Sequence, residues 1–187
     1  MIDTSVFKPF PTLESNRLRL RKVTLDDTNE IFAIRSDIKV VKYLGKDRSP
    51  DINEAIANIN LLDELLTNET GIRWGITLKP SNKIIGSIGF WKLMKDRFRA
   101  EIGYDLHPDY WNQGIMTEAM KMVIEFGFKT MNLHSIEANT DKDHHATHKV
   151  LIHNGFVKSA HFKENYYYNG IFLDSVIFCL INPNDSR

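Results

Sequence analysis

Residues 100–120, with the sequence AEIGYDLHPDYWNQGIMTEAM, constrain the fold more than any other stretch of the chain. Residues 100–106 predict a strand in which Glu101 has mostly apolar neighbours. A tight turn that contains Gly114 follows, and from Met116 onward apolar residues recur at the spacing of an amphipathic helix. The segment therefore predicts a buried strand that runs through a glycine turn into a helix.

The turn between this strand and this helix has the features of an anion-binding site. Gly114 is expected to adopt a positive φ, and Thr117 is a candidate for the N-cap of the helix. Free backbone N–H groups and the positive end of the helix dipole then point in the same direction. Because the turn has no Walker lysine, a phosphate ligand is expected without the chemistry of a P-loop NTPase. An ordinary strand-to-helix turn is the alternative.

This turn resembles the acetyl-CoA pyrophosphate loop of the GNAT acyltransferases, most closely that of the RimJ/RimL-type branch, which acetylates protein N-termini. The general signature of the superfamily is Gln/Arg-x-x-Gly-x-Gly/Ala, and within residues 111–116 only Gly114 matches it. The local pattern Tyr-Trp-x-x-Gly-Ile-Met-Thr-Glu-Ala is, however, similar to that of the branch. The resemblance implies that acetyl-CoA is held by Tyr104, Asp105 and Leu106 of the strand and by Asn112, Gln113, Gly114, Ile115, Met116 and Thr117 of the loop.

A second segment, residues 137–156, resembles the other cofactor motif of the family, Asn-x-x-x-x-Asn-x-x-Ser followed by a helix that ends in Gly-Phe. Asn139 matches the first asparagine and Gly155 the final glycine. Thr147 occupies the serine position, and His144 stands at the second asparagine. This histidine departs from the pattern, although an imidazole can still donate one hydrogen bond to a pantetheine carbonyl. The two motifs occur in the order and at the spacing of the family, which favours the assignment.

Length and composition narrow the class of protein. Residues 1–187 have the size of one domain and contain no linker or repeat that would divide them. The 24 basic and 24 acidic residues balance, which argues against a dedicated nucleic-acid-binding or membrane-surface protein. A basic stretch at Arg17, Arg19, Arg21 and Lys22 is better explained as the solvent face of a strand. No signal peptide opens the chain and no apolar run approaches transmembrane length, so the cytoplasm is the expected location.

Hydrophobic periodicity predicts the remaining elements. Helices are expected to begin at Thr24 and at Ser49-Pro50-Asp51, strands at 17–23, 74–78, 84–91, 135–140 and 172–181, and a short helix at 144–153. Two early helices, an antiparallel meander and then alternating strands and helices form an α+β pattern. The GNAT fold has this order, so the resemblance covers nearly the whole chain. It implies a central mixed, mostly antiparallel sheet flanked by helices.

A metal site has to be considered, because five of the seven histidines lie in the segment from His134 to His153. His144, His145 and His148 have spacings that could share one helix face. No HExxH motif and no cysteine or carboxylate cluster accompanies them. No metal is therefore expected.

The resemblance implies an acetyl-CoA-dependent N-acetyltransferase, in which a primary amine attacks the thioester directly. Glu101 matches the glutamate that other GNAT branches use as general base, usually through water. Burial is expected to raise its pKa toward the working pH. The alternative is a structural glutamate bonded to backbone or to an arginine such as Arg99. Strand amides from Tyr104 to Leu106 would hold the pantetheine and help to polarise the thioester carbonyl.

The sequence says less about the group that protonates the leaving thiolate. Leu151 stands where several GNAT branches have a tyrosine, whereas the resemblance to the RimL-like branch gives this role to Thr147. The run Tyr166–Tyr168 beside Asn169-Gly170 is a third option but first indicates a hairpin. A CoA thiolate is a good leaving group, so a dedicated acid is not required. The acceptor site is expected to be lined by Trp74, Trp91 and Tyr167.

The acceptor is expected to be the α-amine of a protein N-terminus, with ribosomal proteins the usual targets of the branch. Aromatic walls with few fixed charges would suit such a terminus better than a polycation. The alternatives are a small-molecule amine, either a polyamine or an antibiotic, and a non-catalytic acyl-CoA-binding module. The protein is expected to act as a monomer or homodimer, without nucleic-acid or membrane partners.

Overall fold

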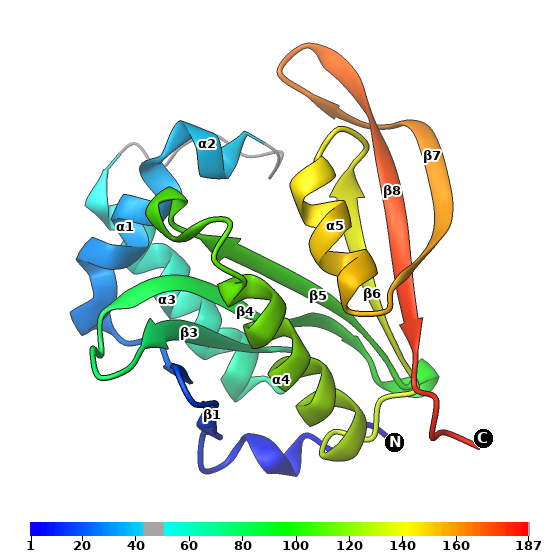
Figure 1. Cartoon of the computed structure of the whole chain (residues 1–187), viewed down its shortest axis with the longest axis horizontal. Coiled ribbons are helices and arrows are strands. Elements are labelled where there is room, and N and C mark those ends of the chain that lie inside the picture. Colours follow the sequence, from blue (N-terminus) through cyan, green and yellow to red (C-terminus); the bar gives the residue numbers. More distant parts are fainter. Residues whose placement is uncertain (43–50, 187) are drawn as a thin grey trace.

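The computed structural model describes residues 1–42 and 51–186 of the chain. Its centre is an eight-stranded sheet in the order β1-β2-β3-β4-β5-β6-β8-β7 (Figure 1). The strands are β1 Leu13–Glu14, β2 Leu18–Lys22, β3 Ile72–Leu78, β4 Ile84–Met94, β5 Arg99–Leu106, β6 Ser135–Asp141, β7 Val157–Tyr168 and β8 Ile171–Ile181. β5 and β6 are parallel neighbours, and the other neighbouring pairs are antiparallel. This mixed, mostly antiparallel sheet confirms the predicted α+β class.

Helices cover both faces of the sheet (Figure 1). They are α1 Thr28–Ser36, α2 Ile38–Val41, α3 Ile52–Thr67, α4 Ile115–Lys129 and α5 His145–His153. α1 and α3 lie on one face, which we call the α1 face, and α4 and α5 lie on the other, the α4 face. Ile31 and Ile59 belong to the smaller core under α1 and α3, whereas Trp74 and Met120 belong to the larger core on the α4 face. Among the described helices none is long and apolar enough to cross a membrane.

Most predicted elements are confirmed, with small shifts at their ends. Thr24 forms the predicted cap as a capping box with Asp27, which opens a short 3-10 helix before α1. Asp51 caps α3 by accepting from the backbone of Asn53 at 2.7 Å, while Ser49-Pro50 lie outside the described residues. The strand β7 was not predicted beyond its terminal hairpin. It is an edge strand that is exposed along most of its length, so its sequence has no continuous apolar face.

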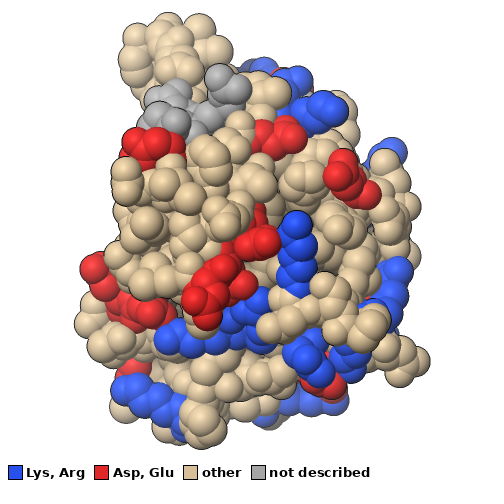
Figure 2. Space-filling model, turned by 90° about the vertical axis from the view of Figure 1, so that its left-hand side faces the viewer, with Lys and Arg blue, Asp and Glu red and all other residues tan. Residues whose placement is uncertain are grey.

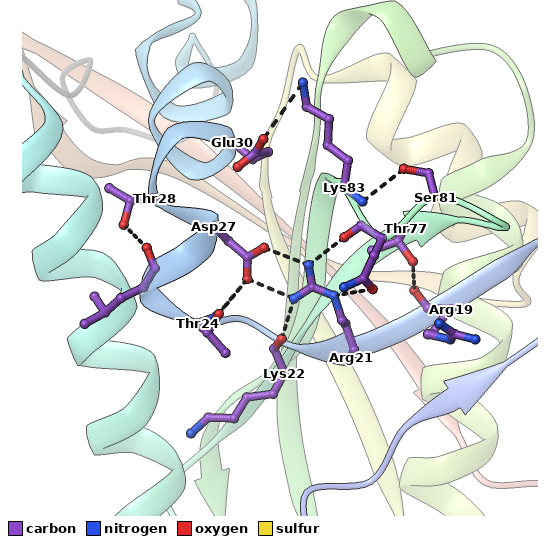
Figure 3. Close-up of polar contacts among 12 residues, drawn as sticks. Arg19, Arg21, Lys22, Thr24, Asp27, Thr28, Glu30, Thr77, Ser81 and Lys83 are labelled. Atoms are coloured by element: carbon purple, nitrogen blue, oxygen red, sulfur yellow. Dashed lines mark hydrogen bonds and ion pairs between the residues drawn. The ribbon is translucent and has the colours of Figure 1, made fainter.

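Arg21 of β2 joins the start of α1 to the sheet (Figure 3). Its guanidinium donates to the two carboxylate oxygens of Asp27 at 2.8 and 2.7 Å, and to the side-chain and main-chain oxygens of Asn82 at 2.8 and 2.6 Å. The Arg21 side chain is 17% exposed, so the prediction of a solvent-facing position is wrong for this residue. Arg19 and Lys22 are partly exposed. On the face of the molecule that lies on the left in Figure 1, acidic and basic side chains are interspersed (Figure 2).

An irregularity in the pairing of β4 with β5 shapes one end of the sheet. The register shifts between Trp91 and Leu93, and Lys92 between them adopts a left-handed φ of 53°. Such a bulge changes the direction of the side chains around it. It therefore alters which β4 side chains can approach Glu101, the register partner of Trp91.

β5 and β6 separate halfway along their length. They pair over three residue pairs, the last of which is Glu101 with Glu137. Both strands continue, β5 to Leu106 and β6 to Asp141. Beyond Glu101 they have no register with each other in the described chain, and we call this opening the β5–β6 seam. The seam leaves strand backbone available to something other than another strand.

Candidate functional site

The turn before α4 has the backbone geometry of an anion site. Gly114 is the N-cap of α4 with the predicted positive φ, 71°, and Asn112 is also left-handed at 59°. No side chain caps the helix, so its first N–H groups face the turn without a side-chain acceptor. The prediction of Thr117 as N-cap is wrong, because the helix already begins at Ile115 and Thr117 lies in its first turn.

Side chains of the loop hold its shape. The indole N–H of Trp111 donates to the Leu106 carbonyl at 2.8 Å, and the Gln113 amide donates to the Asp109 carbonyl at 2.9 Å. The side chains of Ile115 and Met116 are buried in the larger core. The backbone N–H groups of Ile115 and Met116 can therefore face a ligand, while the side chains of these residues and of Trp111 and Gln113 stabilise the loop.

Arg17 brings a positive charge to this turn, which the sequence did not indicate. Its Nη1 donates to the Gln113 carbonyl at 3.1 Å, and its Nε lies 2.5 Å from a carboxylate oxygen of Glu118. A Cβ placed on Gly114 would lie 3.4 Å from Arg17 Nη2. About a hundred residues separate the partners, so only the tertiary fold reveals the contact. The turn therefore combines a helix N-terminus with a held guanidinium, which fits a phosphate.

The α4 face of the seam carries Tyr104 on β5 and Thr147 on α5. The Tyr104 oxygen is buried without a well-formed hydrogen bond to any described residue. Burial raises the pKa of the Tyr104 phenol above its ordinary value, and the nearby Thr147 hydroxyl offsets this only in part. Thr147 is itself buried. The structure thus brings the two predicted residues together, and the Tyr104 hydroxyl can still form a hydrogen bond with a ligand.

His144 lies at the start of α5, behind Thr147. Its Nε2 is 3.3 Å from the Thr147 hydroxyl, and burial together with the neighbouring His148 lowers its pKa to about 4. His144 is therefore neutral at pH 7. His148 instead contacts the Thr140 hydroxyl at 3.0 Å and the Asp141 carbonyl at 3.1 Å. Within residues 1–42 and 51–186 no group of three acidic, histidine or cysteine side chains could hold a metal ion.

The ends of α5 and β6 match the second motif. Gly155 follows the C-cap of α5 with a φ of 85°, as predicted for a helix-terminating glycine. Asn139 is exposed on β6 beyond the last residue paired with β5, so it borders the seam. Leu151, at the position where other branches have a tyrosine, is fully buried in the core.

Glu101 lies at the point where the seam opens. Its side chain is on the α1 face of the sheet, like that of Asp105 on the same strand. It is 5% exposed, and burial raises its pKa while the Lys92 ammonium, 3.1 Å away, opposes the rise. The expected direction of the pKa is confirmed. Arg99 pairs with Glu137 instead, so the alternative partner is wrong. Lys92 reaches Glu101 from the bulge of β4.

Of the predicted aromatic walls, Trp91 lies at Glu101. It is 41% exposed, and Lys92 Nζ sits 4.4 Å from the centre of its ring. Trp74 is fully buried on the α4 face and donates to the Pro11 carbonyl at 2.7 Å, so its assignment to the acceptor site is wrong. Alternation along β3 places it with the core residues rather than with its neighbour Arg73.

Tyr167 lies on the exposed side of β7. It is 64% exposed, and its ring centre is 5.0 Å from that of Phe172 on β8. Strand alternation puts Tyr166 on the other side, where burial and the Asp141 carboxylate raise its pKa. The predicted hairpin at Asn169-Gly170 is confirmed. Tyr166, rather than Tyr167, faces the end of β6.

The α1 face carries a polar cluster that the sequence did not indicate. Arg73 donates from Nε to the Ser87 hydroxyl and from Nη2 to Asp105, each at 2.9 Å. The other Asp105 oxygen accepts from the Ser87 backbone at 3.0 Å and from its hydroxyl at 2.8 Å. The Asp105 side chain is thus committed on the face opposite α4, so only its backbone is left for the predicted cofactor role. The expectation of few fixed charges near Glu101 is wrong.

The chain is similar to known proteins over most of its length. The family model of the acetyltransferase (GNAT) domain matches residues 17–157. The chain is 35% identical over 176 residues to the uncharacterized N-acetyltransferase YoaA of Bacillus subtilis, covering 94% of this chain and 99% of that protein. The crystal structure of the ribosomal-protein-S5-alanine acetyltransferase of Vibrio fischeri has a TM-score of 0.78 at 25% identity, covering 93% and 98% of the two chains. The spermidine N(1)-acetyltransferase of Escherichia coli is 19% identical over 167 residues, covering 89% and 87%.

Proposed function

Since this chain belongs to the GNAT family and is an acetyl-CoA-dependent N-acetyltransferase, we propose that it acetylates the α-amine of a protein N-terminus with Glu101 as general base. One observation carries the proposal. A buried carboxylate of raised pKa stands where β5 and β6 separate, on the face opposite the helix N-terminus that suits phosphates. Acceptor and cosubstrate would then approach the seam from opposite faces.

The turn and the seam fit the two ends of acetyl-CoA, which supplies the acetyl group as a thioester. The uncapped N–H groups of α4 and the guanidinium of Arg17 suit its phosphates. The open backbone of β5 and β6 suits the amides of its pantetheine. The proposed contacts are Asn112, Gln113, Gly114, Ile115, Met116 and Thr117 through the loop backbone, Tyr104, Asp105 and Leu106 along β5, and Asn139, His144 and Thr147 across the seam.

Glu101 would take the proton that the acceptor amine must lose before it can attack. A base is most effective when its pKa lies near the working pH. Burial moves the Glu101 pKa upward in that direction, and the Lys92 ammonium opposes the rise. The Trp91 side chain lies in register with Glu101 and would form one wall for the acceptor.

Thr147 would donate a hydrogen bond to the departing thiolate on the α4 face. Its hydroxyl is buried between Tyr104 and the neutral His144. Because a thiolate is already a good leaving group, removal of this hydroxyl should cost less activity than removal of the base.

The similarity to a ribosomal-protein-S5-alanine acetyltransferase supports an N-terminal acceptor. The similarity to a spermidine acetyltransferase makes a polyamine the second candidate. The charges near Glu101 favour the first, because Lys92 and Arg73 lie there while Asp105 is already paired. A polycation would instead require several free carboxylates.

The test is acetyl transfer from acetyl-CoA to three acceptors: a short C-terminally amidated peptide beginning with alanine, its N-terminally blocked analogue containing lysine, and spermidine. We expect the highest kcat/KM on the free α-amine, partly because its pKa is near 8 and that of lysine is about 10.4. A preference for spermidine or for the blocked peptide would refute the N-terminal acceptor. Binding of acetyl-CoA without transfer to any amine would instead indicate a binding module.

A further inference from the structure

The α1 face beside Glu101 has a floor of glycine. Gly89 of β4 and Gly103 of β5 are register partners, and Gly103 lies two residues from Glu101 on the same side of its strand. A Cβ on Gly103 would lie 3.4 Å from Arg73 Nη1 and 3.6 Å from Trp91 Nε1. The Arg73 guanidinium and the Trp91 indole therefore both lie over Gly103, next to the proposed base.

The Arg73 guanidinium keeps donors that the described residues do not use. Nε and Nη2 are engaged by Ser87 and Asp105, whereas Nη1 makes no hydrogen bond to any residue that the structure describes. The engaged donors fix the plane of the guanidinium. Nη1 is thus presented over the glycine floor in a held orientation, which lowers the entropy cost of binding an anion.

A second guanidinium faces the same cluster from α1. Arg35 is partly buried and interacts electrostatically with Asp105, Arg73 and Glu54, of which Glu54 on α3 is exposed. It forms no hydrogen bond or ion pair with the described part of the chain, and burial lowers its pKa. Among the described residues, Asp105 is thus the buried carboxylate that both guanidiniums share. Desolvated positive charge in excess of its partners is costly unless a ligand compensates it.

We propose that Arg35 and Arg73 form a carboxylate-binding subsite, so that the preferred acceptor carries a carboxylate close to the amine it presents to Glu101. The inference rests on the proposed function, because it takes Glu101 as the place of the amine. Glu101 and Gly103 are two residues apart along β5, which is about 7 Å. Consecutive Cα atoms are about 3.8 Å apart, so an acidic side chain on the first or second residue of a peptide has the required reach. The main-chain carboxylate of a free dipeptide offers the same chemistry.

The first test compares acceptors on the unaltered enzyme. Two C-terminally amidated peptides that begin Ala-Glu and Ala-Gln and are otherwise identical differ only in the carboxylate. We expect kcat/KM to be about tenfold higher for the Glu peptide, which is the effect of one charge-assisted hydrogen bond. A second pair, free Ala-Ala and its C-terminal amide, tests recognition of a main-chain carboxylate. A preference that occurs only for free Ala-Ala assigns the subsite to a main-chain carboxylate.

The second test assigns the effect to the arginine on α1. In Arg35→Gln the ratio of kcat/KM for the Glu peptide to kcat/KM for the Gln peptide should shrink several-fold, chiefly through a higher KM for the Glu peptide. Arg97→Gln is the matched control, because Arg97 is an exposed arginine that pairs with Asp96 beyond β4. The preference of this variant for the Glu peptide over the Gln peptide should equal that of the parent enzyme. A thermal melt checks that both variants fold.

The outcomes separate the inference from the proposed function. Equal rates on the Glu and Gln peptides, and on Ala-Ala and its amide, refute the carboxylate subsite and leave N-terminal acetylation standing. An undiminished preference in folded Arg35→Gln removes Arg35 from the subsite. Acetylation of spermidine alone refutes the N-terminal function and the subsite together.

Discussion

Replacing Lys92 by methionine tests whether Glu101 acts as a base whose pKa is set by its neighbours. The Lys92 ammonium lies 3.1 Å from a Glu101 oxygen and favours the charged carboxylate. Its loss removes that support while burial remains, so the pKa of Glu101 must rise further. A general base works only when deprotonated, and the acidic limb of the pH profile should therefore move to higher pH.

The size of the effect follows from the exposure of the lysine. At 3.1 Å the Coulomb energy is about 1.3 kcal/mol at the dielectric constant of water and about 5 kcal/mol at an effective value of 20. Lys92 is 57% exposed, so solvent screening applies and the lower figure is the better guide. About 1 kcal/mol corresponds to roughly 0.7 pH unit, or about a fivefold loss of kcat/KM on the acidic limb.

The assay is kcat/KM of Lys92→Met and of the parent enzyme from pH 5.5 to 9 on one peptide acceptor. The titration of the acceptor amine is common to both enzymes and cancels in the ratio of their rates. The ratio should be near one at high pH and fall toward about one fifth at low pH. Lys95→Met is the matched control, because Lys95 pairs with Glu69 and not with Glu101. A ratio that does not vary with pH would refute the role of Glu101 as a base tuned by Lys92.

Three further predictions concern the cosubstrate and the base. Saturating acetyl-CoA, at about 100 times its Kd, should add roughly 2.7 kcal/mol to the free energy of unfolding, and a thermal melt without an upward shift would contradict the binding site. Gly114→Glu should abolish acetyl-CoA binding in calorimetry, whereas Gly170→Glu, at another positive-φ glycine with open space around it, should bind normally; retained affinity in a folded Gly114→Glu would place the anion site elsewhere. Glu101→Gln should lower kcat by about 10²–10⁴ with acetyl-CoA affinity unchanged, against no loss in the exposed Glu125→Gln, and normal turnover would make Glu101 structural.

The sequence predicted what depends on local pattern. The strand, glycine turn and helix around Gly114 are all present, since periodicity and backbone conformation encode them over a few residues. The burial of Glu101 followed in the same way from its apolar neighbours. Strand alternation places Trp74 on the same side as Ile72 and Ile76 in the core, so local pattern also argues against its expected place in the acceptor site.

Contacts across the fold could not be predicted from the chain alone. Lys92 reaches Glu101 because of a one-residue bulge in β4, which no residue type in that stretch announces. Arg17 meets the Gly114 turn through the placement of β2 beside α4, and the cluster of Arg73 with Asp105 requires the register of three strands. In each case the local sequence of the two segments does not show that they meet in the fold.

The short pairing of β5 with β6 divides the sheet mechanically. One part comprises β1 to β5 with α1 to α4, and the other comprises β6 to β8 with α5. Only three residue pairs of the described sheet join them, and α4 adds contacts with β6 and α5. A molecule that hydrogen-bonds to both edges of the seam would work as a splint between these parts. Acetyl-CoA would then have a second task as a temporary member of the scaffold, because it would set the spacing between Trp91 on one part and Tyr166 on the other. The link between the two parts would then be broken each time CoA leaves. The substrates would in that case bind in a fixed order, with acetyl-CoA before the acceptor.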